Sequence, residues 1–417
     1  MSTARICVVT AGHLATCPRM LKAADALAGD GYRVRVVSTR HMAWADEADR
    51  DVLRRRPGAW TWTPVDYRSS GAAIAYTWTG ARRRAAAAAA GLSGSARLPL
   101  AIGARAYSRA HTEIVAAALA EPADLFYGGT TGALAAAAEA GSRTGVPFGL
   151  DLEDFHPAEH AAGPGADVAH ALADRILRDV LPRARFLTTS SEAIAAAYAE
   201  RYAVRARVVH NTFPLPSDPP VLEPSPGEGL RLYWFSQTIG ARRGLEDVVR
   251  AMGMAAVPGE LHLRGRGDAL YLREIERLAE SQAPLLKLVV HAPGLPDAMV
   301  ALCAGYDVGL AVESPHVLNR DLCSPNKPYT YLLAGLAVVL TDTAGQRPLA
   351  ADLGEGALTY RPGDVGALAA GLRRWAEDKT ALGAAKVAAW RAAGRRWHWE
   401  HPAERGALLE AVEGVLS

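Results

Sequence analysis

The sequence predicts an α/β protein with two domains, each built on a parallel β-sheet. The chain has 417 residues, whereas a single hydrophobic core stops growing at roughly 250 to 300 residues. Short apolar runs alternate with helical patterns in both halves, which is typical of parallel strands joined by helices. A proline-rich stretch interrupts this alternation near the middle of the chain. We therefore expect a first domain at 1–213, a linker at 214–229, a second domain at 230–395, and a C-terminal helix at 396–417 that crosses back to the first domain.

The N-terminal half has the pattern of a Rossmann-like domain. A helix is expected at 18–28, because Pro18 suits a first helical turn and Gly29 with Gly31 can end the helix. The alanine run at 85–90 also predicts a helix. The expected strands lie at 6–10, 33–38, 124–127, 147–151, 185–189 and 206–209.

The linker sequence PLPSDPPVLEPSPGE has no apolar period, so it cannot form a buried element. Strands are then expected at 230–236, 259–265, 285–291, 307–313 and 336–341. The helices between them are expected at 245–252, 269–280 and 296–304. From Val365 the pattern is almost wholly helical, and four tryptophans can anchor it: Trp375, Trp390, Trp397 and Trp399.

The composition excludes several classes of protein. Hydrophobic residues make up 50% and charged residues 22%, and the net charge is +2, which gives no field that favours nucleic acid. We find no apolar window long enough for a membrane span and no leader pattern in MSTARICVVT, so we expect a cytoplasmic protein. The cysteines lack metal-ligand spacing, so we expect no zinc site; they are Cys7, Cys17, Cys303 and Cys323.

The first candidate site follows the strand LRLYWFS. Arg242 and Arg243 stand just before a helix that begins at Gly244. Guanidinium groups at a helix N-terminus make a site for a diphosphate, although two solvated loop arginines are the alternative. Gly265 and Gly267 follow the next strand and would let the backbone approach a ligand. Leu270 stands where a dinucleotide fingerprint has its third glycine, so an oxidoreductase is disfavoured.

The segment ESPHVLNRDLCSPNKPYTYLLAGLAVVLTDTAGQ, which begins at Glu313, resembles the retaining family 4 glycosyltransferases. In one branch of that family such a segment grips the nucleotide diphosphate, and the matching residues here are Pro325, Asn326, Lys327, Tyr329, Tyr331 and Gly335. GARRGLEDVVRAM resembles the family's phosphate-binding segment, with Arg243 as its basic residue. VVHNTFP at 208–214 and ATCPRMLKAADALAGDGYRVRVV extend the resemblance over the first domain.

The resemblance implies a GT-B fold, in which two Rossmann-like domains face each other across a cleft, and a nucleotide-sugar donor. Leu322 and Thr330 replace two glutamates of the family, the second of which binds the donor ribose. We expect the Thr330 hydroxyl, or Glu313, to take over that contact. The expected donor-binding residues are Gly12, His13, Arg242, Gly265, Gly267, Gly294, Glu313, Ser324, Asn326 and Thr330.

In the first domain, polar groups crowd the strand end in GLDLEDFHPAEH: Asp151, Glu153, Asp154, His156 and Glu159. This density indicates a site, and the resemblance places a sugar-binding histidine in this stretch. The alternative is a solvated loop with an Asx turn and a helix cap at Asp154 or His156. Gly12 and His13 follow the first strand and could lie near the transferred sugar, or simply form a turn.

We therefore predict a metal-independent glycosyltransferase with no cofactor besides its co-substrate, the nucleotide-sugar donor. The expected catalytic residues are Arg243, Lys327, Glu153, Asp154 and His156. The two cations would stabilise the leaving diphosphate. Retention follows from the resemblance, whereas Glu153 or Asp154 acting as a general base would fit inversion. The acceptor is a small molecule, a glycan or a lipid-linked compound.

Two other functions remain open: a catalytically silent pseudo-glycosyltransferase that binds nucleotide or supports a partner enzyme, and a nucleotide-sugar epimerase. The segment Arg82–Arg109 places basic residues on an alanine-rich helical pattern and could touch an anionic acceptor or a membrane surface. Arg54–Arg56 and Arg395–Arg396 are interpreted as solvated, and His210 as structural.

Overall fold

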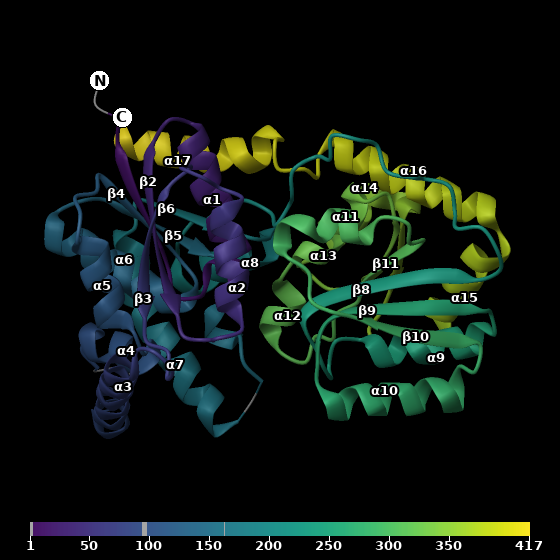
Figure 1. Ribbon diagram of the computed structural model, residues 1–417, viewed down its shortest axis with the longest axis horizontal. Helices are drawn as coiled ribbons and strands as arrows, with labels where there is room; N and C mark the ends of the chain where they lie inside the picture. The colour runs from purple at the N-terminus through teal and green to yellow at the C-terminus, as the bar shows by residue number, and fades with distance from the viewer. Residues whose placement is uncertain (1–2, 94–97, 162) are drawn as a thin grey trace. The chain divides into compact units, whose positions relative to one another are not determined.

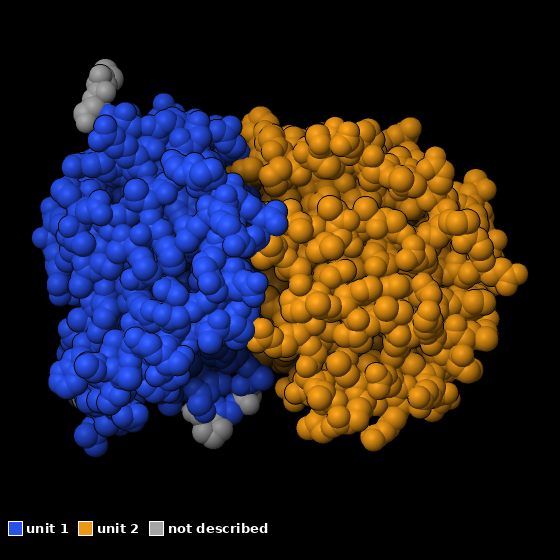
Figure 2. All heavy atoms as spheres, in the orientation of Figure 1, with its two compact units in different colours: residues 1–209, 405–417 blue, residues 210–404 orange. Residues whose placement is uncertain are grey.

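The computed structural model describes residues 3–93, 98–161 and 163–417. The chain forms two compact units, Met1–Val209 with Arg405–Ser417 (unit 1) and His210–Glu404 (unit 2), shown in different colours in Figure 2. Each unit contains one sheet in which all the strand pairs are parallel. The predicted fold class, two Rossmann-like α/β domains, is confirmed.

The sheet of unit 1 has seven strands in the order β3-β2-β1-β4-β5-β6-β7. The strands are β1 (Arg5–Thr10), β2 (Arg33–Arg40), β3 (Thr61–Asp66), β4 (Leu125–Gly129), β5 (Phe148–Leu152), β6 (Phe186–Thr189) and β7 (Arg207–Val208). The sequence did not predict β3, whose TWTPVD contains Pro64. A proline lacks the N–H of a ladder and is tolerated on an edge strand, which is where β3 lies.

Helices cover both faces of this sheet (Figure 1). They are α1 (Pro18–Gly29), α2 (Ala45–Arg54), α3 (Ala73–Ser93), α4 (Leu100–Tyr107), α5 (His111–Leu119), α6 (Thr131–Thr144), α7 (Pro164–Val180), α8 (Glu192–Tyr202) and α17 (Ala407–Leu416). The helix α17 contacts α1 and β6, so the C-terminal residues belong to unit 1. Gly31 has a φ of 93°, and it ends α1 with the paired hydrogen bonds of a Schellman motif.

The sheet of unit 2 has six strands in the order β10-β9-β8-β11-β12-β13. The strands are β8 (Leu230–Ile239), β9 (Gly259–Gly267), β10 (Leu286–His291), β11 (Val308–Ala311), β12 (Ala337–Thr341) and β13 (Ala357–Tyr360). The helices are α9 (Leu245–Ala255), α10 (Ala269–Gln282), α11 (Met299–Cys303), α12 (Leu318–Leu322), α13 (Asn326–Leu333), α14 (Arg347–Leu353), α15 (Val365–Glu377) and α16 (Lys379–Arg395). The edge strand β13 was also missed by the sequence analysis.

Strand β8 divides the core of unit 2 into two layers. Leu232 and Trp234 pack with residues of α9, α10 and α15 on one face of the sheet. Tyr233 and Phe235 pack with residues of α11, α13 and α16 on the other face. Successive side chains of a strand point to opposite faces, so a run of apolar residues buries both sides of this central strand.

Candidate functional site

In the sheet of unit 2, the strand order changes direction between β8 and β11. These strands are neighbours, but the chain continues from β8 to β9 on one side and from β11 to β12 on the other. Ligands of open α/β sheets bind outside the carboxyl ends of the strands at such a switch point. The segments after β8 and β11 carry Arg243 and Glu313, two residues that the sequence analysis singled out.

Glu313 is the centre of a charge cluster at this point. Its side chain is buried, with Oε1 at 2.7 Å from the Lys327 Nζ atom and Oε2 at 3.4 Å from the Arg320 Nη1 atom. Arg243 interacts electrostatically with both Glu313 and Arg320. Lys327 is itself buried and lies 5.4 Å from the centre of the Trp234 ring. Three cations therefore surround one carboxylate, which leaves an excess of positive charge.

The pKa shifts follow from this arrangement. Burial raises the pKa of Glu313, but Lys327 and Arg320 oppose it more strongly, so its pKa is lowered and the carboxylate is ionised. Burial and the positive charge of Arg320 lower the pKa of Arg243. The guanidinium groups thus repel each other, and a bound anion would relieve that repulsion. Arg320 was missed because it lies on the short helix α12, and no pattern separates it from other surface arginines.

A pocket of about 480 Å³ adjoins the cluster. It is lined by Ala241, Arg242, Gly244, Glu246, Asp247, Arg250, Glu313, Ser314, Pro362 and Gly363. Gly244 has a φ of 76° and precedes α9, whose first N–H groups have no partner within the helix. The volume lies in the range of small-molecule sites. Arg242 is exposed at the rim, with a φ of 62°.

Three other residues predicted from the same segment are placed differently. Asn326 begins α13 beside Lys327 and is partly exposed. The buried Ser324 hydroxyl is 2.7 Å from the Tyr329 hydroxyl. Thr330 is fully buried and donates its hydroxyl to the Asn326 carbonyl at 3.0 Å. The Thr330 hydroxyl is thus satisfied on the preceding helical turn, and its contact with the donor ribose stays a prediction.

The predicted glycines are accounted for by packing inside each unit. A Cβ atom on Gly265 would lie 2.3 Å from the Ser236 carbonyl oxygen, and one on Gly267 would lie 2.3 Å from Leu272. A Cβ on Gly294 would meet Leu302 at 2.4 Å. Gly12 is confined in the same way, at 2.6 Å from the Cys17 Sγ atom. Packing alone therefore explains why no side chain is present at these glycines, and the approach of their backbone to a ligand stays a prediction.

Unit 1 has its own switch point, between β1 and β4. The N–H of Ala11, after β1, donates to the Thr130 Oγ1 atom at 3.0 Å. Thr130 has a φ of 72°, a conformation that is unfavourable for a β-branched residue. Thr131 begins α6, and its hydroxyl lies 2.7 Å from the His156 Nδ1 atom. Both threonines were missed, although the run GGTTG after an apolar strand is the signal that could have revealed them.

His156 is a buried histidine with one unsatisfied nitrogen. Its Nδ1 atom lies 3.0 Å from the Glu159 Oε2 atom, and Nε2 has no hydrogen-bond partner among the described residues. Burial lowers the pKa of His156, but the hydrogen bond to Glu159 and the nearby carboxylates outweigh it, so the pKa is raised. Glu153 and Asp154 are among those carboxylates. The protonated ring can therefore present an Nε2–H donor to a ligand.

In the stretch from Asp151 to Glu159, two observations show which side chains have a structural role and which remain candidates for ligand binding. Asp151 accepts two hydrogen bonds from the buried Arg19, at 2.6 and 2.8 Å, and is thus part of the core. The short helix at His156–Ala158 is capped at Phe155 without a side-chain hydrogen bond. The alternative that Asp154 or His156 is merely a helix cap is therefore not supported.

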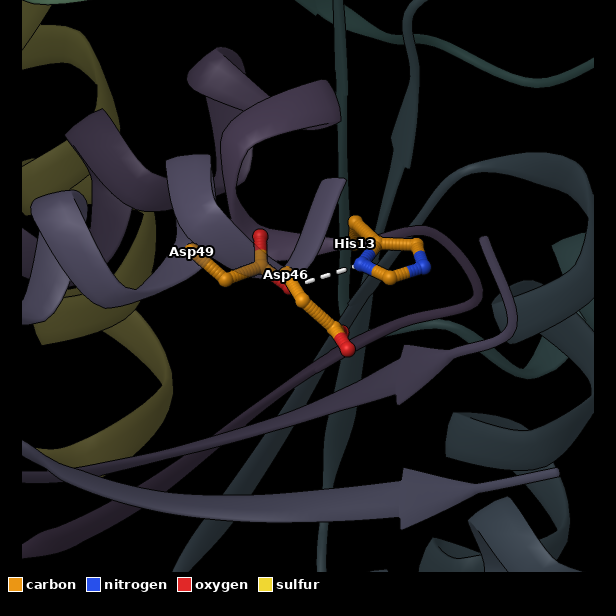
Figure 3. A group of neighbouring side chains, drawn as sticks. All are labelled: His13, Asp46 and Asp49. Atoms are coloured by element: carbon orange, nitrogen blue, oxygen red, sulfur yellow. Dashed lines mark hydrogen bonds and ion pairs between the residues drawn. The ribbon is translucent and has the colours of Figure 1, made fainter. Parts of the chain in front are cut away.

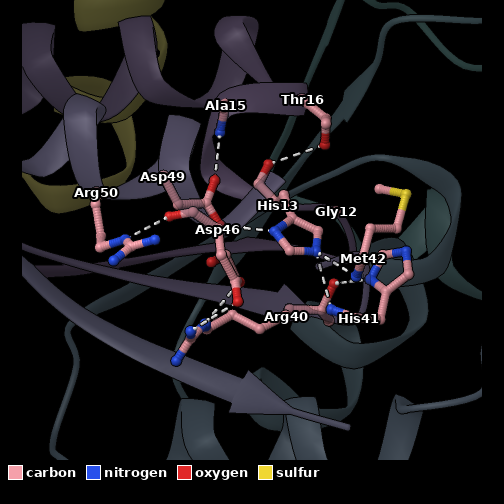
Figure 4. A network of polar contacts seen from close by, with 12 residues as sticks. Gly12, His13, Ala15, Thr16, Arg40, His41, Met42, Asp46, Asp49 and Arg50 are labelled. Carbon is pink, nitrogen blue, oxygen red and sulfur yellow. Dashed lines mark hydrogen bonds and ion pairs between the residues drawn. The ribbon is translucent and has the colours of Figure 1, made fainter. Parts of the chain in front are cut away.

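His13 lies in a buried polar network with Asp46 and Asp49 (Figure 3), and side-chain atoms of the three lie within 4.8 Å of one another. The His13 Nδ1 atom is 2.7 Å from Asp49 Oδ2, while Nε2 accepts the N–H groups of His41 and Met42, both at 2.9 Å (Figure 4). Asp46 is paired with arginines, Arg40 at 3.2 Å and Arg68.

Because two N–H groups point at Nε2, that nitrogen carries no hydrogen, and Nδ1 donates to Asp49. Both ring nitrogens of His13 are thus committed to the fold, and the ring is fully buried. The fold thus accounts for the His13 side chain, and the expectation that Gly12 and His13 lie near the transferred sugar stays a prediction. The network holds the segment after β2 against the loop after β1, and its ligand atoms are already used by protein partners.

No family model matches the sequence, and no curated protein matches it. The structure resembles solved glycosyltransferases along its whole length. HepE of Anabaena, in complex with UDP-glucose, is 16% identical with a TM-score of 0.63, over 99% of both chains. Sucrose-phosphate synthase of Thermosynechococcus elongatus is 14% identical with a TM-score of 0.63, over 98% of both chains. The outer core galactosyltransferase WaaB is 10% identical with a TM-score of 0.56, over 98% of this chain and 99% of WaaB. The chain shares the GT-B fold with these proteins.

Proposed function

We propose that this protein is a glycosyltransferase that moves a sugar from a nucleoside diphosphate to a hydroxyl acceptor. The observation that carries the proposal is the cluster of Arg243, Arg320 and Lys327 around Glu313, at the switch point of unit 2 and beside the 480 Å³ pocket. The excess of positive charge in this cluster suits a diphosphate. The pocket meets the cluster at Glu313. HepE was solved with UDP and with UDP-glucose, so uridine donors are the first to test.

The chemistry we propose is the following. The bond between the sugar C1 and the diphosphate oxygen breaks, the acceptor oxygen bonds to C1, and the hydroxyl proton passes to the leaving phosphate. Negative charge grows on the diphosphate in this step, and the three cations lower the barrier because they are already held in place. Retention and independence of metal are parts of this proposal.

In unit 1 we propose that the Nε2–H of His156 binds a hydroxyl group of the substrate, while Glu153 and Asp154 favour its protonated state. We also propose a cytoplasmic location. The four cysteines are buried and free, which fits a reducing compartment.

The test is substitution of the cations. Arg243→Ala and Lys327→Ala should each lower UDP affinity, measured by calorimetry, and the release of UDP from UDP-glucose by about a hundredfold, or ~2.7 kcal/mol. Arg320→Gln should act in the same direction. Arg277→Gln, on the exposed side of α10, is the matched control and should change neither quantity. Full UDP affinity in both alanine variants would reject the assigned phosphate site.

A second candidate function is a pseudo-glycosyltransferase that binds nucleotide without turnover. It is favoured by one observation: Leu322 and Thr330, at the positions of the family's two glutamates, are both buried and offer no carboxylate. Slow hydrolysis of UDP-glucose by the pure protein would argue against this candidate. Tight UDP binding with no release of UDP from any donor, with or without acceptors, would favour it over the enzyme.

A further inference from the structure

The two ring nitrogens of His156 lie in different environments. The Nδ1 atom is 2.7 Å from the Thr131 Oγ1 atom and 3.0 Å from the Glu159 Oε2 atom. The Thr131 hydroxyl lies 3.4 Å from the same Glu159 oxygen and can donate to it. The Nε2 atom is buried and, in the part of the chain that the structure describes, has no hydrogen-bond partner. This difference determines where the ring holds its proton.

The Glu159 carboxylate decides which nitrogen always carries a hydrogen. A carboxylate only accepts hydrogen bonds, so an Nδ1 atom without a hydrogen would place two acceptors against each other at 3.0 Å. Nδ1 therefore keeps a hydrogen, which it donates toward Glu159, while the Thr131 hydroxyl donates to the same carboxylate. In the neutral ring of His156 the nitrogen without a hydrogen is then Nε2. The proton that the ring gains or loses is thus the one on Nε2.

The electrostatic surroundings of the ring support this assignment. Burial raises the pKa of Glu159, but the hydrogen bond and the charge of His156 lower it further, so the group is ionised. Burial also raises the pKa of the Tyr107 hydroxyl to about 12, so Tyr107 adds no charge. The other titratable groups near the ring are His170 and Asp167 on α7, Tyr198 on α8, and Glu153, Asp154 and His160 in the loop itself. The loop carboxylates act on His156 in the same direction as Glu159, so the doubly protonated ring is favoured.

We propose that Glu159 and Thr131 are positioning residues: they hold Nδ1 and so present Nε2 as the one ring atom that bonds to the substrate. This assignment rests on the proposed function, in which Nε2–H binds a substrate hydroxyl group. A ring whose other nitrogen is held has one tautomer and one orientation, whereas an unheld neutral ring divides between two tautomers. Thr131 is the first residue of α6, and Glu159 directly follows the short helix His156–Ala158. The sheet of unit 1 therefore brings the two positioning residues together from separate segments.

The experiment is a pH titration of the full chain with isotope-labelled histidine, in which NMR follows the ring nitrogens. The His156→Gln variant identifies the signals of this ring among the 12 histidines. The test variants are Glu159→Gln, Thr131→Val and the conservative Thr131→Ser. The matched control is Asp167→Asn, which removes a carboxylate of α7 that acts on His170. The rate of UDP release from UDP-glucose is measured for the same proteins at the same pH values.

We expect Nδ1 of the wild type to keep its hydrogen throughout the titration, and Nε2 alone to lose one. Without the Glu159 charge this loss occurs at lower pH, so Glu159→Gln should shift it down by about one pH unit. The rate of UDP release by Glu159→Gln should then fall about tenfold at alkaline pH, but by no more than about twofold near pH 6. Thr131→Val should shift in the same direction by less, while Thr131→Ser and Asp167→Asn should match the wild type.

A wild-type ring of His156 that loses its hydrogen from Nδ1 would overturn the assignment. So would a Glu159→Gln ring that titrates as the wild-type ring does. Both results come from the nitrogen signals, which need no turnover. Absence of UDP release from every protein would instead reject the proposed function, so the two failures are distinguishable.

Discussion

At the residue scale, one buried carboxylate organises the candidate site of unit 2. A lysine as buried as Lys327 needs a charged partner, because an unpaired ammonium group is costly to remove from water. Glu313 supplies that partner and also contacts Arg320. The position of Lys327 after Pro325 and Asn326 could be predicted from the sequence. Its pairing with Glu313 could not, because the two residues come from different elements that only the folded sheet brings together.

His156 gives a prediction about pH. Its pKa is raised in the folded state, so the stabilisation by the protonated ring is fully present below about pH 6.5, its ordinary value, and is lost as pH rises through the raised folded pKa. The unfolding midpoint of the wild type should therefore fall relative to that of His156→Gln as the pH rises above about 6.5. Thermal denaturation of both proteins at a series of pH values measures this difference. The exposed His316→Gln should run parallel to the wild type, and a parallel curve for His156→Gln would contradict the assignment.

The network of His13, Asp46 and Asp49 gives a prediction about metal ions. Its nitrogen and oxygen atoms are already engaged by N–H groups and by Arg40 and Arg68, so an ion would have to displace them. Adding Mn²⁺ or Zn²⁺ to the protein should leave its unfolding midpoint unchanged, because only an ion that binds the native state stabilises it. A rise in the midpoint that His13→Asn abolishes would show that a metal site exists here.

At the element scale, the helix α13, which carries Lys327, ends at a glycine with a defined hydrogen-bond pattern. Gly335 has a φ of 70°, and the N–H groups of Gly335 and Leu336 return to Leu332 and Tyr331 in a Schellman motif. A Cβ atom there would lie 2.7 Å from Pro220 and 2.8 Å from Leu222. The sequence analysis singled out Gly335 and predicted the strand that follows it. It could not predict that the linker residues Pro220 and Leu222 pack against Gly335, because they lie far from it in the sequence.

Gly335→Ala should destabilise the protein by about 2 kcal/mol or more, from the left-handed conformation and from the steric clash together. Gly305→Ala is the matched control, because Gly305 has a φ of 83° but open space around it. The control should cost only about 1 kcal/mol. Urea denaturation measures both values. Equal losses in the two variants would mean that the contact with the linker contributes nothing.

At the scale of the whole molecule, the chain passes from one unit to the other twice, at 209–210 and at 404–405. A buried carboxylate joins these points within unit 2. Glu404 accepts the N–H of His210 at 2.5 Å, lies 2.9 Å from the His210 Nδ1 atom, and pairs with Arg396 at 2.5 Å. His210 is thus held in a structural role, and the two ends of unit 2 are fixed to each other.

Glu404→Gln should cost about 3 kcal/mol at neutral pH, because it removes the charge from a buried ion pair. Burial raises the pKa of Glu404, but His210 and Arg396 lower it further, so the wild-type advantage is present above about pH 4.5 and is lost as pH falls through the lowered folded pKa. Glu410 forms an exposed ion pair with Arg207, so Glu410→Gln should lower the free energy of unfolding by no more than about 0.5 kcal/mol. Chemical denaturation at two pH values measures both, and a deficit that persists in acid would contradict the charge-based explanation.

The sequence by itself determined the two α/β domains, their central strands and the positions of Arg243 and Lys327, because local periodicity and strand-end residues record these features directly. The edge strands β3 and β13 escaped it, since an edge strand needs less apolar sequence than a central one. Only the tertiary structure decided that Thr330 and His13 point inward, that Glu313 pairs with Lys327 and Arg320, and that Thr131 meets His156. The physical reason is that burial and charge pairing depend on contacts between elements that are distant in sequence. The pattern of a single segment indicates only which of its own side chains share a face.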